Sequence, residues 1–195
     1  MEDRRVRKTK AALKSGFARL LLQKNINEIT VSELTELVDI HRGTFYLHYR
    51  DIYDLQEKIQ EEIVEDIEEI IRLNHQNILG ANPFPFMLAL MNYLQKNHTI
   101  GLAFLSQNGD MKFIDRIVKL TRERCLYQWM EKHVSEGDTY YRYFCEYTVS
   151  GCISIVRYWL NNGTVETPEE MAGIMKNLSQ SGMGFLVKNG AAGAM

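Results

Sequence analysis

The sequence predicts an all-α protein, and three observations carry that prediction. Apolar residues recur at helical spacing over long segments, and no segment has a convincing strand pattern. Only three prolines occur among 195 residues, two of them at Pro83 and Pro85, which favours long uninterrupted helices. Short runs rich in glycine and asparagine separate the periodic segments. These segments correspond to about nine helices.

The first predicted helix spans residues 3–24. Its apolar residues have the spacing of one buried face: Val6, Leu13, Phe17, Leu20 and Leu21. Its beginning is dense in basic residues: Arg4, Arg5, Arg7, Lys8 and Lys10. Such a run is usually a solvated surface, but beside a DNA-binding motif it is expected to contact phosphates.

Residues 30–49, TVSELTELVDIHRGTFYLHY, predict two short helices joined by a tight turn at Val38-Asp39-Ile40. Thr30 and Glu33 have the spacing of a capping box at the start of the first helix. Its apolar face is expected to consist of Val31, Leu34, Leu37 and Val38. The second helix is expected to direct Ile40, Phe45 and Tyr49 inward.

The outward face of the second helix is unusual for a soluble protein. It would present Arg42, Gly43, Thr44, Tyr46, Leu47 and His48. Side chains of these types bond to base edges and phosphates. Two short helices crossing through a brief turn form the DNA-binding helix-turn-helix, whose second helix enters the major groove. The alternative is an ordinary helical hairpin.

A long helix is predicted from Ile52 to about Gln76. Its apolar stripe consists of Leu55, Ile59, Ile63, Ile67, Ile70 and Ile71. Its acidic residues lie elsewhere on the helix: Glu57, Glu61, Glu62, Glu65, Asp66, Glu68 and Glu69. A di-iron site would need Glu-x-x-His pairs, which are missing from the sequence, so we interpret these carboxylates as a solvated face.

Five further helices are predicted after a break at residues 79–85. They cover residues 86–96, a short segment to 106, 111–133, 140–160 and 168–188. Thr167 and Glu170 have capping-box spacing at the start of the last, with Pro168 at the first helical position. The tail NGAAGAM is expected to fray.

Charge is distributed unevenly along the chain. Residues 1–50 carry 10 Lys/Arg against 6 Asp/Glu, a net of +4, whereas residues 51–80 carry 2 against 9, a net of -7. Residues 81–195 carry 11 against 10, a net of +1. A polyanion is therefore expected to approach the N-terminal end.

Catalysis has little support in the sequence. The chain lacks HExxH, G-x-S-x-G and P-loop motifs, and its five histidines are scattered without metal-ligand spacing, so we expect no enzyme, metal or cofactor. Cys125, Cys145 and Cys152 form no CxxC pair and are expected to be buried thiols. Cys145 and Cys152 lie seven residues apart, which leaves oxidation sensing as an alternative.

Membrane insertion is not expected either. No apolar run approaches the roughly 18 residues of a transmembrane helix, and the N-terminus is charged where a signal peptide would be apolar. We therefore expect a cytoplasmic protein with no membrane contact.

The run RGTFYLHYRDIYDL resembles the N-terminal signature of the TetR family of bacterial transcriptional regulators, and the resemblance covers about residues 3–56. The run IVRYWLNNGTVETPEEM resembles the C-terminal half of one branch of that family. The resemblance implies a helix-turn-helix domain over residues 1–51 and a helical ligand-binding and dimerisation domain over residues 52–188. The glycine- and alanine-rich residues 189–195 are expected to form a flexible tail.

Three positions depart from the family pattern. Asp39 stands where glycine is usual, and Asp tolerates a left-handed backbone better than most residues. His41 stands where Ser or Thr usually caps the recognition helix, and Ile52 replaces a lysine that binds phosphate in many relatives. Arg50 is the candidate to compensate. The expected DNA contacts are Arg42, Gly43, Thr44, Tyr46, His48, Lys8, Thr30, Arg50 and His41.

Two further sites are expected in the C-terminal region. An apolar pocket for a small effector would be lined by Phe86, Met87, Met91, Phe104, Phe113, Tyr127 and Met130. Each of these side chains could instead be ordinary core. A dimer interface on the last two helices would include Tyr147, Ile155, Tyr158, Trp159, Met175 and Leu178.

These expectations combine into a homodimeric repressor that a small molecule releases from a near-palindromic double-stranded DNA operator. One alternative is an activator, or a regulator controlled by a protein partner without a ligand pocket. Another is a helical interaction module that has lost DNA binding.

Overall fold

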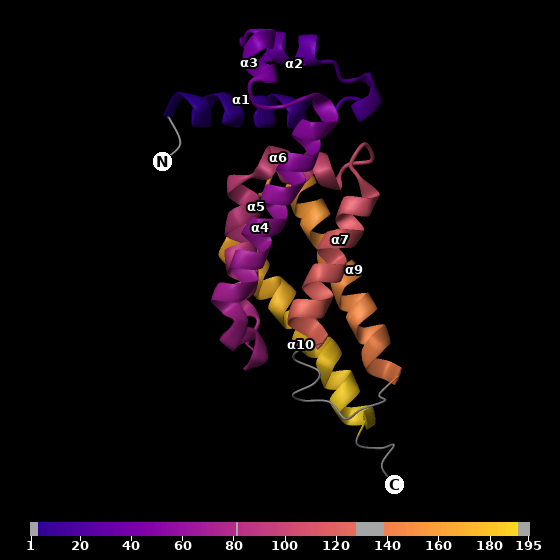
Figure 1. Ribbon diagram of the computed structural model, residues 1–195. Helices are drawn as coiled ribbons and strands as arrows, with labels where there is room; N and C mark the ends of the chain where they lie inside the picture. Colours follow the sequence, from indigo (N-terminus) through magenta and orange to yellow (C-terminus); the bar gives the residue numbers. More distant parts are fainter. Residues whose placement is uncertain (1–3, 81, 128–138, 191–195) are drawn as a thin grey trace. The chain divides into compact units, whose positions relative to one another are not determined.

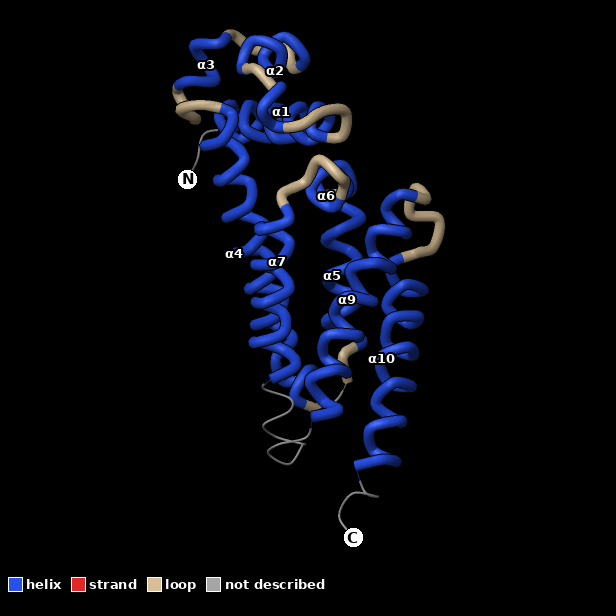
Figure 2. The backbone as a smooth tube through the Cα atoms, turned by 90° about the vertical axis from the view of Figure 1, so that its right-hand side faces the viewer, coloured by secondary structure: helices blue, strands red, loops and turns tan. Residues whose placement is uncertain are grey.

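The computed structural model describes residues 4–80, 82–127 and 139–190 (Figure 1). Nine α-helices lie in this part of the chain: α1 (Arg4–Leu21), α2 (Val31–Leu37), α3 (Arg42–Tyr46), α4 (Ile52–Leu79), α5 (Phe84–Lys96), α6 (His98–Leu105), α7 (Met111–Thr121), α9 (Thr139–Asn161) and α10 (Pro168–Gly190). A 3-10 helix, η1 (Ile26–Glu28), and a π-helical segment, η2 (Arg122–Tyr127), complete the elements. The described residues contain no strand (Figure 2), so the all-α prediction is confirmed.

The chain folds into two compact units. The first consists of residues 1–66 and 97–114, and the second of residues 67–96 and 115–195. Helix α4 therefore contributes residues to both units, because its first half belongs to one and its second half to the other.

The first unit contains the predicted helix-turn-helix. The core of this unit includes Leu13 and Phe17 of α1, Leu34 of α2, Phe45 of α3 and Leu55 of α4, all fully buried. Helix α6 packs against α1. The loop after α6 also reaches α1, because the side-chain amide of Asn108 donates a hydrogen bond to the Leu21 carbonyl at 3.1 Å.

Helices α1 and α2 approach closely at Gly16. A Cβ atom at this position would lie 2.9 Å from Cδ1 of Leu34 and closer still to Cγ1 of Val38. Such a separation is far below the optimum of roughly 3.5–4.0 Å between carbon atoms. A glycine is therefore required where α1 crosses the helix-turn-helix.

The predicted inward face of α2 was partly wrong. Leu37 is 38% exposed, whereas Thr35, which the apolar pattern did not include, is only 2% exposed. The hydroxyl of Thr35 is satisfied inside the helix, because it donates to the carbonyl oxygens of Val31 and Ser32 at 2.8 and 3.0 Å. Burial of this threonine consequently leaves no unpaired donor.

The second unit is built on α5, α9 and α10, with α10 packed against both others. The core of this unit includes Met91, Trp159, Leu160, Ala172 and Met175. The start of α10 is the predicted capping box with Pro168 at its first position. The Thr167 backbone N–H donates to Glu170 Oε2 at 2.8 Å, and the Glu170 N–H donates to Thr167 Oγ1 at 3.2 Å.

The cysteines of the second unit are sheltered thiols. Cys125 and Cys145 are buried, and Cys152 is partly buried. Burial raises the pKa of Cys125 to about 12 and that of Cys152 to about 11. Because the thiolate is the form that reacts with oxidants, these environments disfavour the alternative of oxidation sensing.

Candidate nucleic-acid interface

The helix-turn-helix begins at Thr30, which lies at the N-terminal end of α2. Its hydroxyl accepts a hydrogen bond from the Glu33 backbone N–H at 3.2 Å, which is the Thr30 half of the predicted capping box. The Glu33 carboxylate instead accepts hydrogen bonds from the Lys24 ammonium at 2.7 and 2.6 Å. This ion pair ties α2 to the segment that follows α1, and it was not expected from the sequence.

The turn between α2 and α3 depends on Asp39. Its φ angle is +53°, in the left-handed region, which confirms the conformation expected of a residue that replaces glycine. The Asp39 N–H donates to the Glu36 carbonyl at 3.3 Å, and the Ile40 N–H donates to the Thr35 carbonyl at 2.9 Å. This pair of hydrogen bonds is the Schellman motif that ends many helices.

His41 directly precedes α3 and provides no side-chain cap. The His41 carbonyl accepts hydrogen bonds from the N–H groups of Thr44 and Phe45 at 2.8 and 3.4 Å, so the backbone alone starts the helix. The sequence-based expectation that this histidine is a weak cap is confirmed.

The residues of α3 and of the turn that follows it divide into a buried face and an exposed face. Phe45 is fully buried and Tyr49 is 3% exposed, with their ring centroids 5.6 Å apart. Tyr46 is 52% exposed and Leu47 is 79% exposed. The predicted inward and outward positions are therefore confirmed for these four aromatic and aliphatic residues.

The other predicted contact residues of this region are also accessible. Arg42, Gly43 and His41 are exposed, and Thr44 and His48 are half-buried. No atom lies within 4 Å of a Cβ built at Gly43, so nothing inside the protein demands glycine there. A backbone without a side chain at an exposed site allows close approach of a partner.

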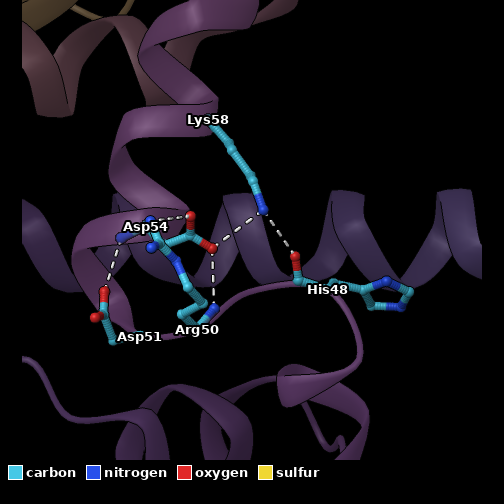
Figure 3. Close-up of polar contacts among 5 residues, drawn as sticks. All are labelled: His48, Arg50, Asp51, Asp54 and Lys58. Carbon is cyan, nitrogen blue, oxygen red and sulfur yellow. Dashed lines mark hydrogen bonds and ion pairs between the residues drawn. The ribbon is translucent and has the colours of Figure 1, made fainter.

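A charged cluster joins the end of the helix-turn-helix to the first turns of α4 (Figure 3). The buried carboxylate of Asp54 accepts hydrogen bonds from the Arg50 backbone N–H at 2.9 Å, the Arg50 guanidinium at 3.2 Å and the Lys58 ammonium at 3.1 Å. Lys58 also donates to the His48 carbonyl at 3.1 Å. The Asp51 side chain caps α4 by accepting from the Asp54 N–H at 2.8 Å.

These contacts shift the ionisation of Asp54. The Arg50 backbone N–H lowers the pKa of the Asp54 carboxyl most, and hydrogen bonds from Lys58 and Arg50 lower it further. Burial acts in the opposite direction but does not prevail. Asp54 is consequently an anion that serves as the centre of the cluster.

Asp54 and Lys58 were not among the site residues expected from the sequence. The available signal was the spacing of Arg50, Asp54 and Lys58, which lie four residues apart in succession with alternating charge. Ile52, where many relatives of the resembled family carry lysine, is buried and forms part of the core. The Arg50 side chain is 82% exposed and Lys8 of α1 is also exposed, so both remain accessible.

The predicted pocket residues are distributed over both compact units. Phe86, Met87 and Met91 are buried in α5 of the second unit. Phe104 and Phe113 belong to the first unit, where their ring centroids lie 5.2 Å apart. Tyr127 is 38% exposed. Met130 lies outside the described residues.

The predicted dimer residues also separate into two groups. Tyr147 and Tyr158 of α9 and Leu178 of α10 are exposed, and Ile155 is half-buried. Trp159 and Met175 instead lie in the core of the unit. The Trp159 indole N–H donates to the Glu166 carbonyl at 2.9 Å. Tyr143 of α9 and Ile174 of α10 are further exposed residues of these helices.

The described part of the chain has neither a candidate metal site nor a candidate membrane-spanning helix. No group of three or more His, Cys, Asp or Glu residues there could hold a metal ion. Within the same residues, no helix combines the length and apolar character needed to cross a bilayer.

Comparison with known proteins relates this chain to transcriptional regulators. A family model described as "Transcriptional regulator C-terminal region" matches residues 81–181. A protein of Bacillus subtilis (strain 168), called "Uncharacterized HTH-type transcriptional regulator YxbF", is 28% identical over 173 residues, which cover 87% of this chain. The aligned part is only 44% of that relative, so this chain spans less than half of its length.

Solved structures share the fold at lower identity. The "Dihydroxyacetone kinase operon activator DhaS" is 20% identical with a TM-score of 0.56, over 89% of this chain and 94% of that one. The transcriptional regulator FadR from Bacillus subtilis, solved in complex with stearoyl-CoA, is 14% identical with a TM-score of 0.60, over 88% of this chain and 98% of that one. These relatives and structural neighbours are transcriptional regulators.

Proposed function

Because the chain belongs to the TetR family of transcriptional regulators, we propose that it is a homodimeric repressor that a small molecule releases from a near-palindromic operator. Its place of action in this proposal is the cytoplasm, where bacterial DNA lies. The proposal requires a surface that reads DNA, a surface that joins two copies, and a ligand that changes the population of DNA-binding dimers.

The two-sided arrangement of α3 is the observation that carries the proposal. Buried Phe45 and Tyr49 anchor the helix, while Arg42 and Tyr46 extend into solvent. A guanidinium donates two parallel hydrogen bonds to guanine O6 and N7, and a tyrosine hydroxyl bonds to bases or phosphates. We assign base or groove contacts to Arg42, Gly43, Thr44, Tyr46 and His48, and phosphate contacts to Lys8, Thr30, His41 and Arg50.

The exposed aromatic residues of α9 support the dimer. Tyr147 and Tyr158 lie on this helix, and Leu178 lies on α10, which packs against it. Exposed apolar and aromatic surface of this kind is enriched at interfaces. A twofold dimer would present two α3 helices to half-sites about one turn of DNA apart or a multiple of it.

Effector control would act through α4, which contributes residues to both compact units. We propose that an apolar small molecule binds among the α5 residues Phe86, Met87 and Met91 of the second unit. The stearoyl-CoA complex of the structural neighbour FadR is consistent with an apolar ligand in this fold. Ligand binding would favour dimers whose two α3 helices have the wrong spacing for the operator.

Activation is the second candidate function. The structural neighbour DhaS is called an operon activator, so the fold alone does not distinguish activation from repression. A reporter gene placed behind the bound DNA separates the two, because deletion of the regulator raises expression for a repressor and lowers it for an activator.

The test of DNA binding is selection of duplexes from a random-sequence library by the full chain, followed by fluorescence anisotropy at two salt concentrations. We expect a selected near-palindrome whose affinity falls steeply with salt, because phosphate contacts release counterions. Arg42→Ala should weaken binding to the selected duplex by about tenfold or more, as expected for loss of one bidentate base contact. Failure to select any duplex at low salt would favour the interaction module instead.

A further inference from the structure

Lys58 holds the end of the recognition segment against α4 (Figure 3). Its ammonium donates one hydrogen bond to the His48 carbonyl and another to the Asp54 carboxylate, both at 3.1 Å. Asp54 in turn accepts the backbone N–H of Arg50 at 2.9 Å. The backbone on both sides of Tyr49 is therefore fastened to α4 by side chains that lie one helical turn apart.

We infer that Lys58, together with Asp54, is a positioning residue for DNA recognition, which sets the orientation of α3 so that its exposed side chains meet the base edges. This inference rests on the proposed function, because it concerns the same DNA-reading surface. It assigns to α4 a role that neither the sequence pattern nor the family resemblance identified.

The short length of α3 explains the need for external support. The helix has five residues, whereas isolated helices below about 12–15 residues are marginal in water. At its N-terminal end, His41 provides backbone hydrogen bonds but no side-chain cap. At the other end, the His48 carbonyl has a charged donor, and hydrogen bonds to charged groups are stronger than neutral ones.

The Lys58 ammonium donates to groups of the protein itself. Two of the three ammonium N–H groups that a lysine carries serve His48 and Asp54, and the ammonium lies 5.2 Å from the Tyr49 ring centroid. Arg50 differs, because its side chain is 82% exposed while one of its nitrogens bonds to Asp54. A guanidinium has five N–H donors, so Arg50 retains donors for phosphate.

The experiment compares two DNA duplexes for each variant by fluorescence anisotropy: the duplex selected by the wild-type chain, and a scrambled duplex of equal length and composition. Binding to the scrambled duplex reports phosphate contacts, whereas the ratio of the two affinities reports base recognition. We expect Lys58→Met to weaken binding to the selected duplex by about tenfold. Its affinity for the scrambled duplex should change by less than about twofold.

Controls separate positioning from other roles. Lys58→Arg keeps a cation and several donors and should restore discrimination. Lys14→Met removes another lysine ion pair of the first unit, that between Lys14 and Glu62, and should leave both affinities unchanged. Circular dichroism verifies the fold, and Lys58→Ala replaces Lys58→Met if that variant does not fold, since alanine has the highest helix propensity.

Two results would overturn the inference. An equal loss on both duplexes would identify Lys58 as a phosphate contact, and no loss on the selected duplex would mean that α3 orients itself without Lys58. Neither result affects the proposed function, whose failure is recognised separately when the wild-type chain selects no duplex.

Discussion

The carboxylate of Asp54 accepts the backbone N–H of Arg50 at 2.9 Å, across the junction between the helix-turn-helix and α4. This hydrogen bond makes the start of α4 part of the DNA-reading unit, because the same carboxylate also binds Lys58. A single buried anion therefore connects the segment after α3 with the helix that both compact units share.

Acid should weaken the first compact unit through Asp54. Its pKa is lower in the folded protein than the ordinary value of 3.8, mainly because of the Arg50 N–H. Such a group stabilises the fold at pH values above its unfolded pKa, and this contribution is lost as pH falls through the folded pKa. Asp54→Asn should therefore lower the urea midpoint at about pH 7, and its curve should approach that of the wild type as pH falls through the lowered pKa of Asp54.

Glu69→Gln is the matched control for Asp54. Glu69 also lies on α4, and its pKa is lowered by a hydrogen bond from Arg72, but both partners are exposed. Exposed ion pairs contribute little to stability, so this variant should follow the wild-type urea midpoint at every pH. If the urea midpoints of the wild type and of Asp54→Asn changed in parallel with pH, this result would contradict the role assigned to Asp54.

Gly16→Ala should destabilise the chain. The added methyl would meet Leu34 Cδ1 at 2.9 Å and Val38 Cγ1 more closely still, so α1 and α2 would have to separate. Overpacking of this kind costs about 1–3 kcal/mol of unfolding free energy. Urea unfolding followed by circular dichroism measures the change, and a midpoint equal to that of the wild type would show that the helices can shift without cost.

Gly43→Ala is the opposite case in the same compact unit. No atom lies within 4 Å of the added methyl, and alanine is favoured over glycine in helices, so stability should rise by up to about 1 kcal/mol. DNA binding should weaken, because the methyl would keep the backbone of α3 away from the groove. If anisotropy gave an unchanged affinity for the selected duplex, the DNA would not approach the α3 backbone at Gly43.

The sequence predicted features that depend on local pattern. Phe45 and Tyr49 follow the helical period, and Asp39 takes a left-handed conformation that few other residues tolerate. Thr35 is buried and Leu37 is exposed, the reverse of what the apolar pattern predicts. A helix of seven residues has too few apolar positions to define which side packs inward. That side is set by Gly16, a residue of another helix.

Features that depend on the path of the chain could not be predicted in the same way. Lys58 binds a backbone carbonyl ten residues earlier, and a carbonyl has no signature in the sequence. Trp159 and Tyr158 are neighbours with similar apolar character, yet one is 1% exposed and the other 69%. Both suit an interface or a core, so the type of residue does not tell which of them is buried.

Tyr158→Glu should convert the proposed dimer into a monomer. Tyr158 is exposed on α9, so a charge there does not disturb the core, but a dimer interface would have to bury that charge without a partner. Sedimentation equilibrium should give twice the chain mass of 22.7 kDa for the wild type and the mass of one chain for the variant. Tyr127→Glu, at another exposed tyrosine of the same unit, should remain dimeric. A Tyr158→Glu chain that keeps the dimer mass would show that two copies associate through a different surface.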